Sequence, residues 1–156
     1  MNRKKYKDKL EFVDDFSLKI EEMGHPRIYG QILGWLIVCE PHHQSFSDLM
    51  TALNISKASV SNTTRILLEA KIIEKVRITG ERQVYFKLKK NALLEFMGKQ
   101  NAIFSEIKTI LDDGRQFLLE SGETDIQRIE KARQFYIFMA AEFPSLLEKF
   151  NSEFGA

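Results

Sequence analysis

The chain has 156 residues, of which 44% are hydrophobic and 29% charged, a composition that indicates a folded globular protein and excludes a disordered one. No apolar run reaches the ~18 residues that a membrane-spanning helix needs, and no apolar stretch of signal-peptide character follows the basic N-terminus. We therefore expect a cytoplasmic protein with no membrane partner. The single cysteine, Cys39, excludes an intramolecular disulfide framework, and its apolar surroundings predict a buried, inert thiol.

The formal net charge is only +1, but the charges are unevenly distributed along the chain. Residues 56–90 hold nine Lys and Arg against three Glu, whereas residues 101–156 hold six basic and ten acidic side chains. This separation favours one surface that attracts a polyanion and another that does not. A solvated strand-and-helix surface is the alternative interpretation of the same charges.

The first two predicted elements are helices. Apolar residues between 5 and 23 recur mostly at spacings of three or four, which predicts a helix that Gly24 ends. Pro26 suits the first position of a second helix, which continues through a nearly uniform apolar segment to Cys39. Because Pro41 cannot continue that helix, residues 40–43 form a loop.

A short helix, a turn, a second helix and a hairpin come next. Ser45 to Asp48 opens the short helix, Asn54 supplies the turn, and Ser56 is a favourable N-cap for a helix that runs to about residue 70. Residues 72–78 and 83–88 alternate apolar and charged side chains as strands do, and Gly80 provides the positive φ of the turn at 79–82.

The remaining sequence predicts helices over 91–119 and from Thr124 onward, separated by a break at Ser121-Gly122, with a kink or restart at Pro144. We predict a mainly α fold with a small β-hairpin wing: a winged helix-turn-helix with N- and C-terminal dimerisation helices. The predicted boundaries are 1–24 for the N-terminal helix, 25–90 for the DNA-binding domain and 91–156 for the C-terminal helical dimerisation region.

The helix at 56–70 has the side chains expected of a helix that reads the DNA major groove. Its predicted inward stripe holds Val60, Thr64, Leu67 and part of Ile66, and its first two turns offer small, polar or cationic groups on the other face. Many of these residues are weak helix formers, which indicates selection for something other than helix stability. The alternative is an ordinary solvated helix. The predicted DNA-contacting residues of this helix are Lys57, Ala58, Ser59, Ser61, Asn62 and Arg65.

The hairpin carries the other predicted DNA contacts. Lys75, Arg77 and Arg82 lie along or at the tip of the wing, where a cation can enter the minor groove or meet phosphate. Glu81 beside the tip would repel phosphate, which weakens the prediction for Arg82.

Four segments of the chain carry a resemblance to a known family: ISKASVS at 55–61, LLEAKIIEKV at 67–76, FVDDF at 12–16 and MGHPRIYGQILG at 23–34. They resemble MarR-type regulators, and more closely their GbsR-like branch. The resemblance covers about residues 10–90 and departs from the usual Asp-x-Arg wing turn, since Gly80-Glu81-Arg82 stands there. It implies a homodimer whose terminal helices form the interface and a small effector that tunes DNA affinity.

Dimerisation is also expected from the wide apolar stripes of the C-terminal helices, which exceed what one partner helix covers; a monomeric core is the alternative. We expect a sequence-specific, homodimeric DNA-binding transcription regulator that is not an enzyme and has no cofactor. A winged-helix adaptor that captures a protein is the alternative.

His42-His43 lacks a third ligand, so no metal site is expected. Core packing is favoured over an effector pocket for four aromatic residues: Tyr29, Trp35, Phe104 and Tyr136. Paired acidic residues at 21–22 and 112–113 are interpreted as solvated helix faces.

Overall fold

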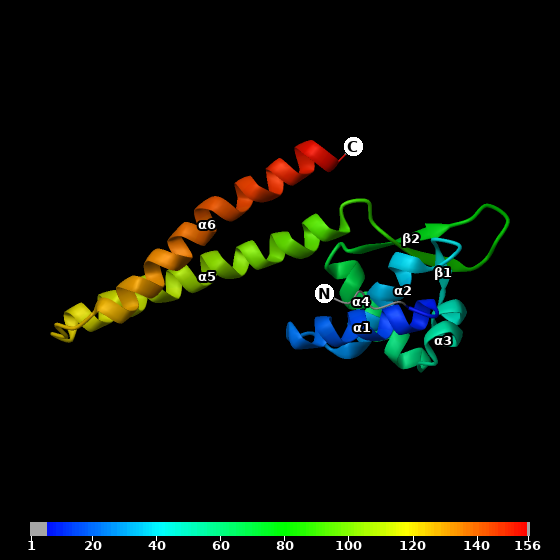
Figure 1. Ribbon diagram of the computed structural model, residues 1–156, viewed down its shortest axis with the longest axis horizontal. Coiled ribbons are helices and arrows are strands. Elements are labelled where there is room, and N and C mark those ends of the chain that lie inside the picture. The colour runs from blue at the N-terminus through cyan, green and yellow to red at the C-terminus, as the bar shows by residue number, and fades with distance from the viewer. Residues whose placement is uncertain (1–5, 156) are drawn as a thin grey trace. The chain divides into compact units, whose positions relative to one another are not determined.

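The computed structural model describes residues 6–155, which form helices and a small antiparallel sheet (Figure 1). The chain divides into two compact units, the first ending at Ala92 and the second beginning at Leu93. No helix of residues 6–155 has the length and apolarity to cross a bilayer. The mainly α fold with a small wing is as predicted. The elements are α1 (Lys9–Glu22), α2 (Arg27–Val38), β1 (Gln44–Ser45), α3 (Phe46–Leu53), α4 (Lys57–Glu69), β2 (Ile73–Arg77), β3 (Val84–Leu88), α5 (Ala92–Glu120) and α6 (Gln127–Phe154).

Local capping groups set both ends of α1. The side chain of Asp8 accepts a hydrogen bond from the Glu11 N–H, so the helix begins at Lys9, later than predicted. The predicted start at residue 5 lies outside the described residues. At the other end Gly24 takes φ +95°, and its N–H donates to the Glu21 carbonyl, which ends the helix as predicted. Pro26 was predicted to be the first helical residue of α2. It is the N-cap instead, because its ψ of 141° is extended.

Two glycines of α2 let α1 approach closely. A Cβ added to Gly30 would lie 2.7 Å from the Ser17 Cα, and one added to Gly34 would lie 3.0 Å from a Phe16 ring carbon. Ser17 is fully buried by this contact. The sequence Gly30-x-x-x-Gly34 therefore gives α2 a flat strip against which the backbone of α1 packs.

The rest of the first unit is assembled on α2. Its core includes Ile32, Leu49, Leu67 and Phe86, each at most 3% exposed. Strand β3 is central in the sheet, pairing with β2 in register Val76↔Tyr85 and with the two-residue β1. The sequence analysis missed β1, because two residues are too few to show an alternating pattern.

The second unit consists of α5 and α6, which diverge away from the turn that joins them (Figure 1). Gly122 at φ +81° makes this turn, as predicted. The last helix begins at Gln127 and not at Thr124, and it continues through Pro144, so the predicted restart there is wrong. Among the described residues of both helices only Ala92 is buried.

Charged side chains connect α5 to α6 near their turn. The guanidinium of Arg133 donates to Asp112 at 2.7 Å and to Glu130 at 2.9 Å, and Arg115 also donates to Glu130. The hydrogen bond from Arg133, followed by one from Lys108, lowers the pKa of Asp112. The hydrogen bond from Arg115 is the main cause that lowers the pKa of Glu130. Asp112 is therefore an ion-paired residue, and its interpretation as part of a solvated helix face was wrong.

Candidate nucleic-acid interface

The candidate reading unit begins with a capped helix and a sharp turn. The Ser45 hydroxyl accepts from the Asp48 N–H at 3.1 Å, while the Asp48 carboxylate accepts from the Ser45 N–H at 2.7 Å. This reciprocal capping box fixes the start of α3. Asn54 then adopts the left-handed conformation, with φ 51° and ψ 52°, as predicted for the turn. Ser56 caps α4 by accepting from the Ser59 N–H at 3.1 Å.

One face of α4 packs into the first unit. Val60 and Leu67 are completely buried, and Thr64 is 2% exposed. The Thr64 hydroxyl donates to the Val60 carbonyl at 2.7 Å, which satisfies its polar group inside the core. Thr63 also faces inward, and Ile66, which was predicted to lie only partly inward, is 44% exposed.

The opposite face of α4 is open, as predicted. Five of the six residues proposed to contact DNA on this helix are exposed: Lys57, Ala58, Ser61, Asn62 and Arg65. Ser59 is only half-buried, and its hydroxyl lies 2.9 Å from that of Ser56. Ser59 therefore takes part in the cap as well as lining the outer face. Four of the exposed groups lie in the first two turns of α4, at the end where the helix dipole places partial positive charge, and Arg65 lies one turn further along.

The two cations of this outer face differ in their ion-pair partners. Within residues 6–155, Lys57 makes no ion pair, but Arg65 lies 3.4 Å from the carboxylate of Glu69, one turn further along α4. Both side chains are about two-thirds exposed, so this pair contributes little to stability and Arg65 is readily released to another anion.

The end of α4 is tightly joined to the start of β2. Lys71 takes φ 59°, and the N–H of Ile72 donates to the Leu67 carbonyl at 3.0 Å, which closes the last helical turn. The Ile72 carbonyl accepts from Lys89 at 3.0 Å, beyond the end of β3. Ile72 and Ile73 are nearly fully buried, so this junction is part of the core.

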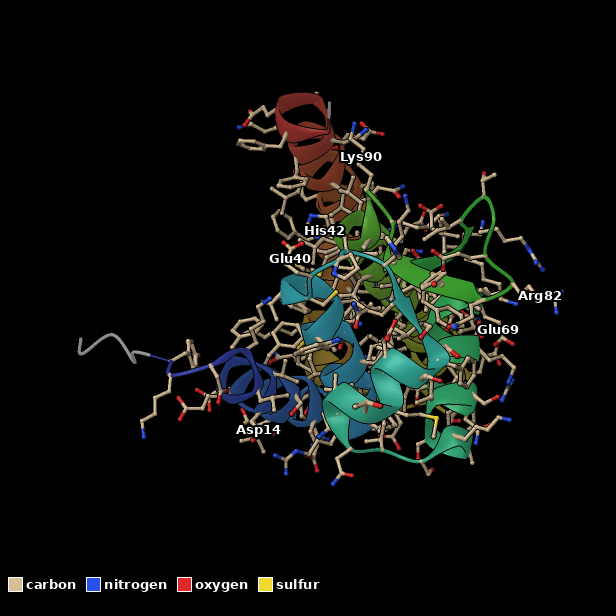
Figure 2. The ribbon with its side chains drawn as sticks, turned by 90° about the vertical axis from the view of Figure 1, so that its right-hand side faces the viewer. Asp14, Glu40, His42, Glu69, Arg82 and Lys90 are labelled. Carbon is tan, nitrogen blue, oxygen red and sulfur yellow. The ribbon has the colours of Figure 1, made fainter. Side chains whose placement is uncertain are left out.

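The wing is the loop between β2 and β3. Gly80 has φ +89°, as predicted, and the Glu81 N–H donates to the Ile78 carbonyl at 3.0 Å. Figure 2 shows Arg82 at the outer bend of this loop. In the described part of the chain none of the three wing cations makes an ion pair, and all are exposed: Lys75, Arg77 and Arg82.

The wing also contains a contact that the sequence analysis missed. The hydroxyl of Tyr85, on β3, donates a short hydrogen bond to the Glu81 carboxylate. This hydrogen bond is the main cause that raises the pKa of Tyr85. A tyrosine four residues after a loop carboxylate was the only available signal, and it is too common to have indicated the contact.

Comparisons with known proteins agree with this architecture. Residues 91–153 match the family model of MmpR5-like MarR family transcriptional regulators. The chain is similar to the HTH-type transcriptional regulator MmpR5 of Mycobacterium tuberculosis, with 28% identity over 148 residues that cover 95% of this chain and 90% of that protein. A crystal structure described as a transcriptional regulator has a TM-score of 0.77 and 28% identity, covering 93% of this chain and 99% of that one. The chain is thus similar to MarR family transcriptional regulators in its C-terminal helices and to MmpR5 over most of its length.

The family match adds to the resemblance found in the sequence. That resemblance covered about residues 10–90, whereas the family model matches the C-terminal helices, for which the sequence offered no motif. The GbsR-like branch stays a prediction. The Staphylococcus aureus regulator MepR, which has been solved in complex with DNA, is more distant, with 20% identity and a TM-score of 0.43 over 88% of this chain and 91% of that one.

The four aromatic residues considered for an effector pocket are divided between the two units of the chain. In the first unit Tyr29 is buried and stacks on His25 at 4.9 Å, and the Trp35 indole donates to Gln44. In the second unit the rings of Phe104 and Tyr136 lie 6.2 Å apart. Each pair is explained by packing within its own unit.

Cys39, also in the first unit, is 1% exposed, and burial raises the pKa of its thiol. Within residues 6–155 the chain has no group of three His, Cys, Asp or Glu side chains that could hold a metal ion.

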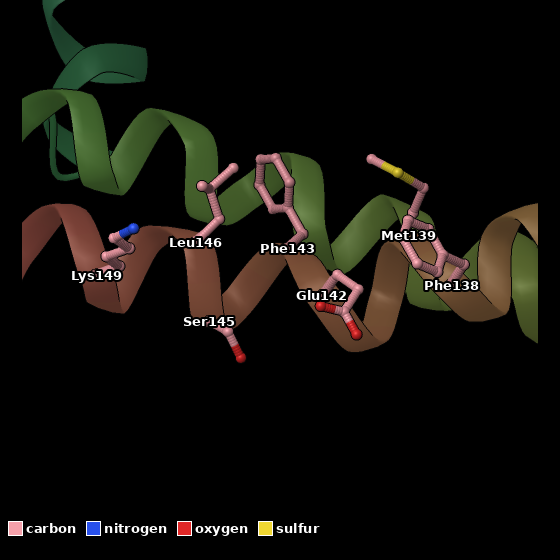
Figure 3. A pocket seen from close by; sticks show the side chains of 7 residues that line it. All are labelled: Phe138, Met139, Glu142, Phe143, Ser145, Leu146 and Lys149. Atoms are coloured by element: carbon pink, nitrogen blue, oxygen red, sulfur yellow. The ribbon is translucent and has the colours of Figure 1, made fainter.

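A groove of about 370 Å³ runs along α6 in the second unit. Figure 3 shows Met139, Phe143 and Leu146 projecting to one side of the helix, and Glu142 and Ser145 to the other. The full lining is Phe138, Met139, Glu142, Phe143, Ser145, Leu146 and Lys149.

Proposed function

We propose that this chain is a MarR-type transcription regulator, a cytoplasmic protein that binds double-stranded DNA as a homodimer and carries out no catalytic step. The first turns of α4 enter the major groove, and the wing lies on the adjacent backbone or minor groove. The observation that carries this proposal is the division of α4 into a fully buried face and an opposite polar and cationic face that the described chain leaves open.

The exposed residues suit distinct parts of a DNA surface. Ala58 and Ser61 are small enough to let the helix backbone approach the bases, and Asn62 has the paired donor and acceptor that fit an adenine edge. Arg65 can exchange its exposed partner Glu69 for guanine or phosphate. Lys57 and the wing cations supply affinity for phosphate that does not depend on sequence.

The second unit supplies the argument for two copies. Helices α5 and α6 bury almost none of their own side chains, and eleven of their large hydrophobic residues are more than 36% exposed. A helix pair of this kind is unstable in water unless another apolar surface covers it. A second copy brings the same uncovered surface, so association covers both at once and presents two α4 helices to one DNA duplex.

The homodimer is tested by light scattering after size exclusion. We expect twice the chain mass of 18.2 kDa at micromolar concentration. Leu146→Glu places a charge on an apolar position of α6 that is 61% exposed and should shift the mass toward the monomer, while Lys131→Glu on the same helix should not. A monomeric parent protein would contradict the dimer.

DNA binding is tested with duplexes that the parent protein selects from fragments of its source genome. We expect Arg65→Ala and Asn62→Ala each to weaken binding by about 1–3 kcal/mol. Arg128→Ala, which removes an exposed cation from α6, is the matched control and should bind like the parent. Unchanged binding by both α4 variants would show that the reading helix is wrongly assigned.

Salt dependence separates DNA binding from the alternative function as a protein adaptor. Binding to DNA releases counterions, so the affinity should fall steeply between low and moderate salt. An adaptor that captures a protein partner through apolar contacts would keep its affinity as salt rises. A small effector that tunes DNA affinity stays a prediction from the family resemblance.

A further inference from the structure

A continuous set of contacts leads from α2 to the wing. The Trp35 indole N–H donates to the Gln44 side-chain oxygen at 2.9 Å. The amide of Gln44, which is 5% exposed, donates to the carbonyls of Pro41 and His43 at 3.0 and 3.2 Å. The ring of His43 then meets the Tyr85 ring edge-on, with their centroids 4.9 Å apart. The position of the Tyr85 side chain is therefore fixed through β1 by the core of the first unit.

Tyr85 carries this order into the loop. Its backbone is held on both sides, since it pairs with Ser45 in β1 and with Val76 in β2. Its hydroxyl reaches back four residues to the carboxylate of Glu81. The backbone of Glu81 makes one hydrogen bond to other backbone groups within residues 6–155, from its N–H to the Ile78 carbonyl, so the side-chain bond is a second and independent anchor of the loop.

This anchor matters because of what stands next to Glu81. A free carboxylate at the tip of the wing would repel phosphate or pair with the neighbouring Arg82, and either would weaken a contact of Arg82 with DNA. The hydrogen bond directs the Glu81 carboxylate to Tyr85, while Arg82 has no ion pair within residues 6–155.

We infer that Tyr85 is a positioning residue for DNA binding: it fixes Glu81, and thereby holds the wing loop in the conformation that offers Arg82 to the minor groove or the phosphates. The inference rests on the proposed DNA-binding function. It explains how a wing with Gly80-Glu81-Arg82 at its turn keeps an acidic residue beside a DNA-contacting arginine.

The first test removes only the hydroxyl. Tyr85→Phe keeps the ring contact with His43, so we expect an unchanged fold and melting temperature but an affinity for the selected duplex about 3- to 10-fold weaker. Tyr136→Phe is the matched control. It removes the hydroxyl of an α6 tyrosine that makes no hydrogen bond within residues 6–155, and it should bind like the parent.

A double-mutant cycle with Arg82 separates positioning from general damage. If Tyr85 acts through Arg82, the double variant Tyr85→Phe, Arg82→Ala should bind no more weakly than Arg82→Ala alone. The salt slope of Tyr85→Phe should also fall by about one counterion, as for Arg82→Ala. Additive losses would mean that Tyr85 acts elsewhere and would overturn the inference.

The remaining outcomes distinguish the inference from the function on which it rests. If Arg82→Ala weakens binding and Tyr85→Phe does not, the inference is wrong and the DNA-binding function stands. If neither Arg65→Ala nor Arg82→Ala weakens binding, the proposed function itself fails. NMR order parameters of the backbone at 79–83 need no DNA: they should fall in Tyr85→Phe, and unchanged values would also overturn the inference.

Discussion

The contact between α1 and α2 gives a sharp prediction for Gly30→Ala. The added Cβ would lie 2.7 Å from the Cα of Ser17 and 2.9 Å from the Cβ of Ile20, so the backbone of α1 must move by about an ångström to restore an ordinary contact of 3.5–4 Å. Overpacking of this kind costs about 1–3 kcal/mol, and the gain from replacing a helical glycine returns about 0.5–1 kcal/mol. We expect a net destabilisation of about 1–2 kcal/mol.

Urea unfolding followed by circular dichroism measures this change, and for a unit of this size the melting temperature should fall by about 10 °C. Two other glycines are graded controls. A Cβ at Gly34 meets only a ring carbon of Phe16 at 3.0 Å, which can rotate away, so Gly34→Ala should cost less. Gly98→Ala meets nothing within 4 Å and should be neutral or stabilising. Equal stability of the Gly30 and Gly98 variants would refute the close-packing argument.

Three further predictions concern stability. The pKa values of Asp112 and Glu130 are lowered in the folded chain, so their contribution to the free energy of unfolding is complete above the ordinary values of 3.8 and 4.5 and is lost as the pH falls below them. The melting temperature should drop in that pH range, and Arg133→Gln should make the drop smaller. Lys71→Gly relieves a left-handed φ of 59°, so it should leave the free energy of unfolding unchanged or raise it by up to about 1 kcal/mol. A clear loss of stability in a urea titration would count against strain at this residue. Ser45→Ala removes half of the capping box and should cost about 1 kcal/mol in the same titration, and no loss would show that the box is unimportant.

The sequence predicted the features that depend on local rules. Four such features follow from the chemistry of one residue and its near neighbours: the helix start at Ser45, the turn at Asn54, the cap at Ser56 and the positive φ of Gly80. Val60, Thr64 and Leu67 were placed inward because their spacing on α4 is helical. The prediction left out Thr63, which lies three residues after Val60 and is closer to the centre of the buried stripe than the partly exposed Ile66.

Features that join distant residues could not be predicted. Nothing in the local sequence distinguishes Asp112, which pairs with Arg133, from its neighbour Asp113. The contact from Tyr85 to Glu81 requires knowledge of the loop path, and the role of Gly30 requires knowing which helix lies across it. Each depends on the arrangement of elements in space, which a periodic pattern does not contain.

The junction at Lys71 has a mechanical consequence. Since buried Ile72 is bonded both to Leu67 in α4 and to Lys89 beyond β3, the angle between the reading helix and the wing is a property of one rigid body. Bending that body would mean breaking core hydrogen bonds. In the proposed homodimer, we expect a signal that weakens DNA binding to leave each copy intact and to change the distance between the two copies, so that their α4 helices no longer match successive grooves about 34 Å apart. Changes at the proposed dimer contact should then control DNA binding more readily than changes at the junction between α4 and β2.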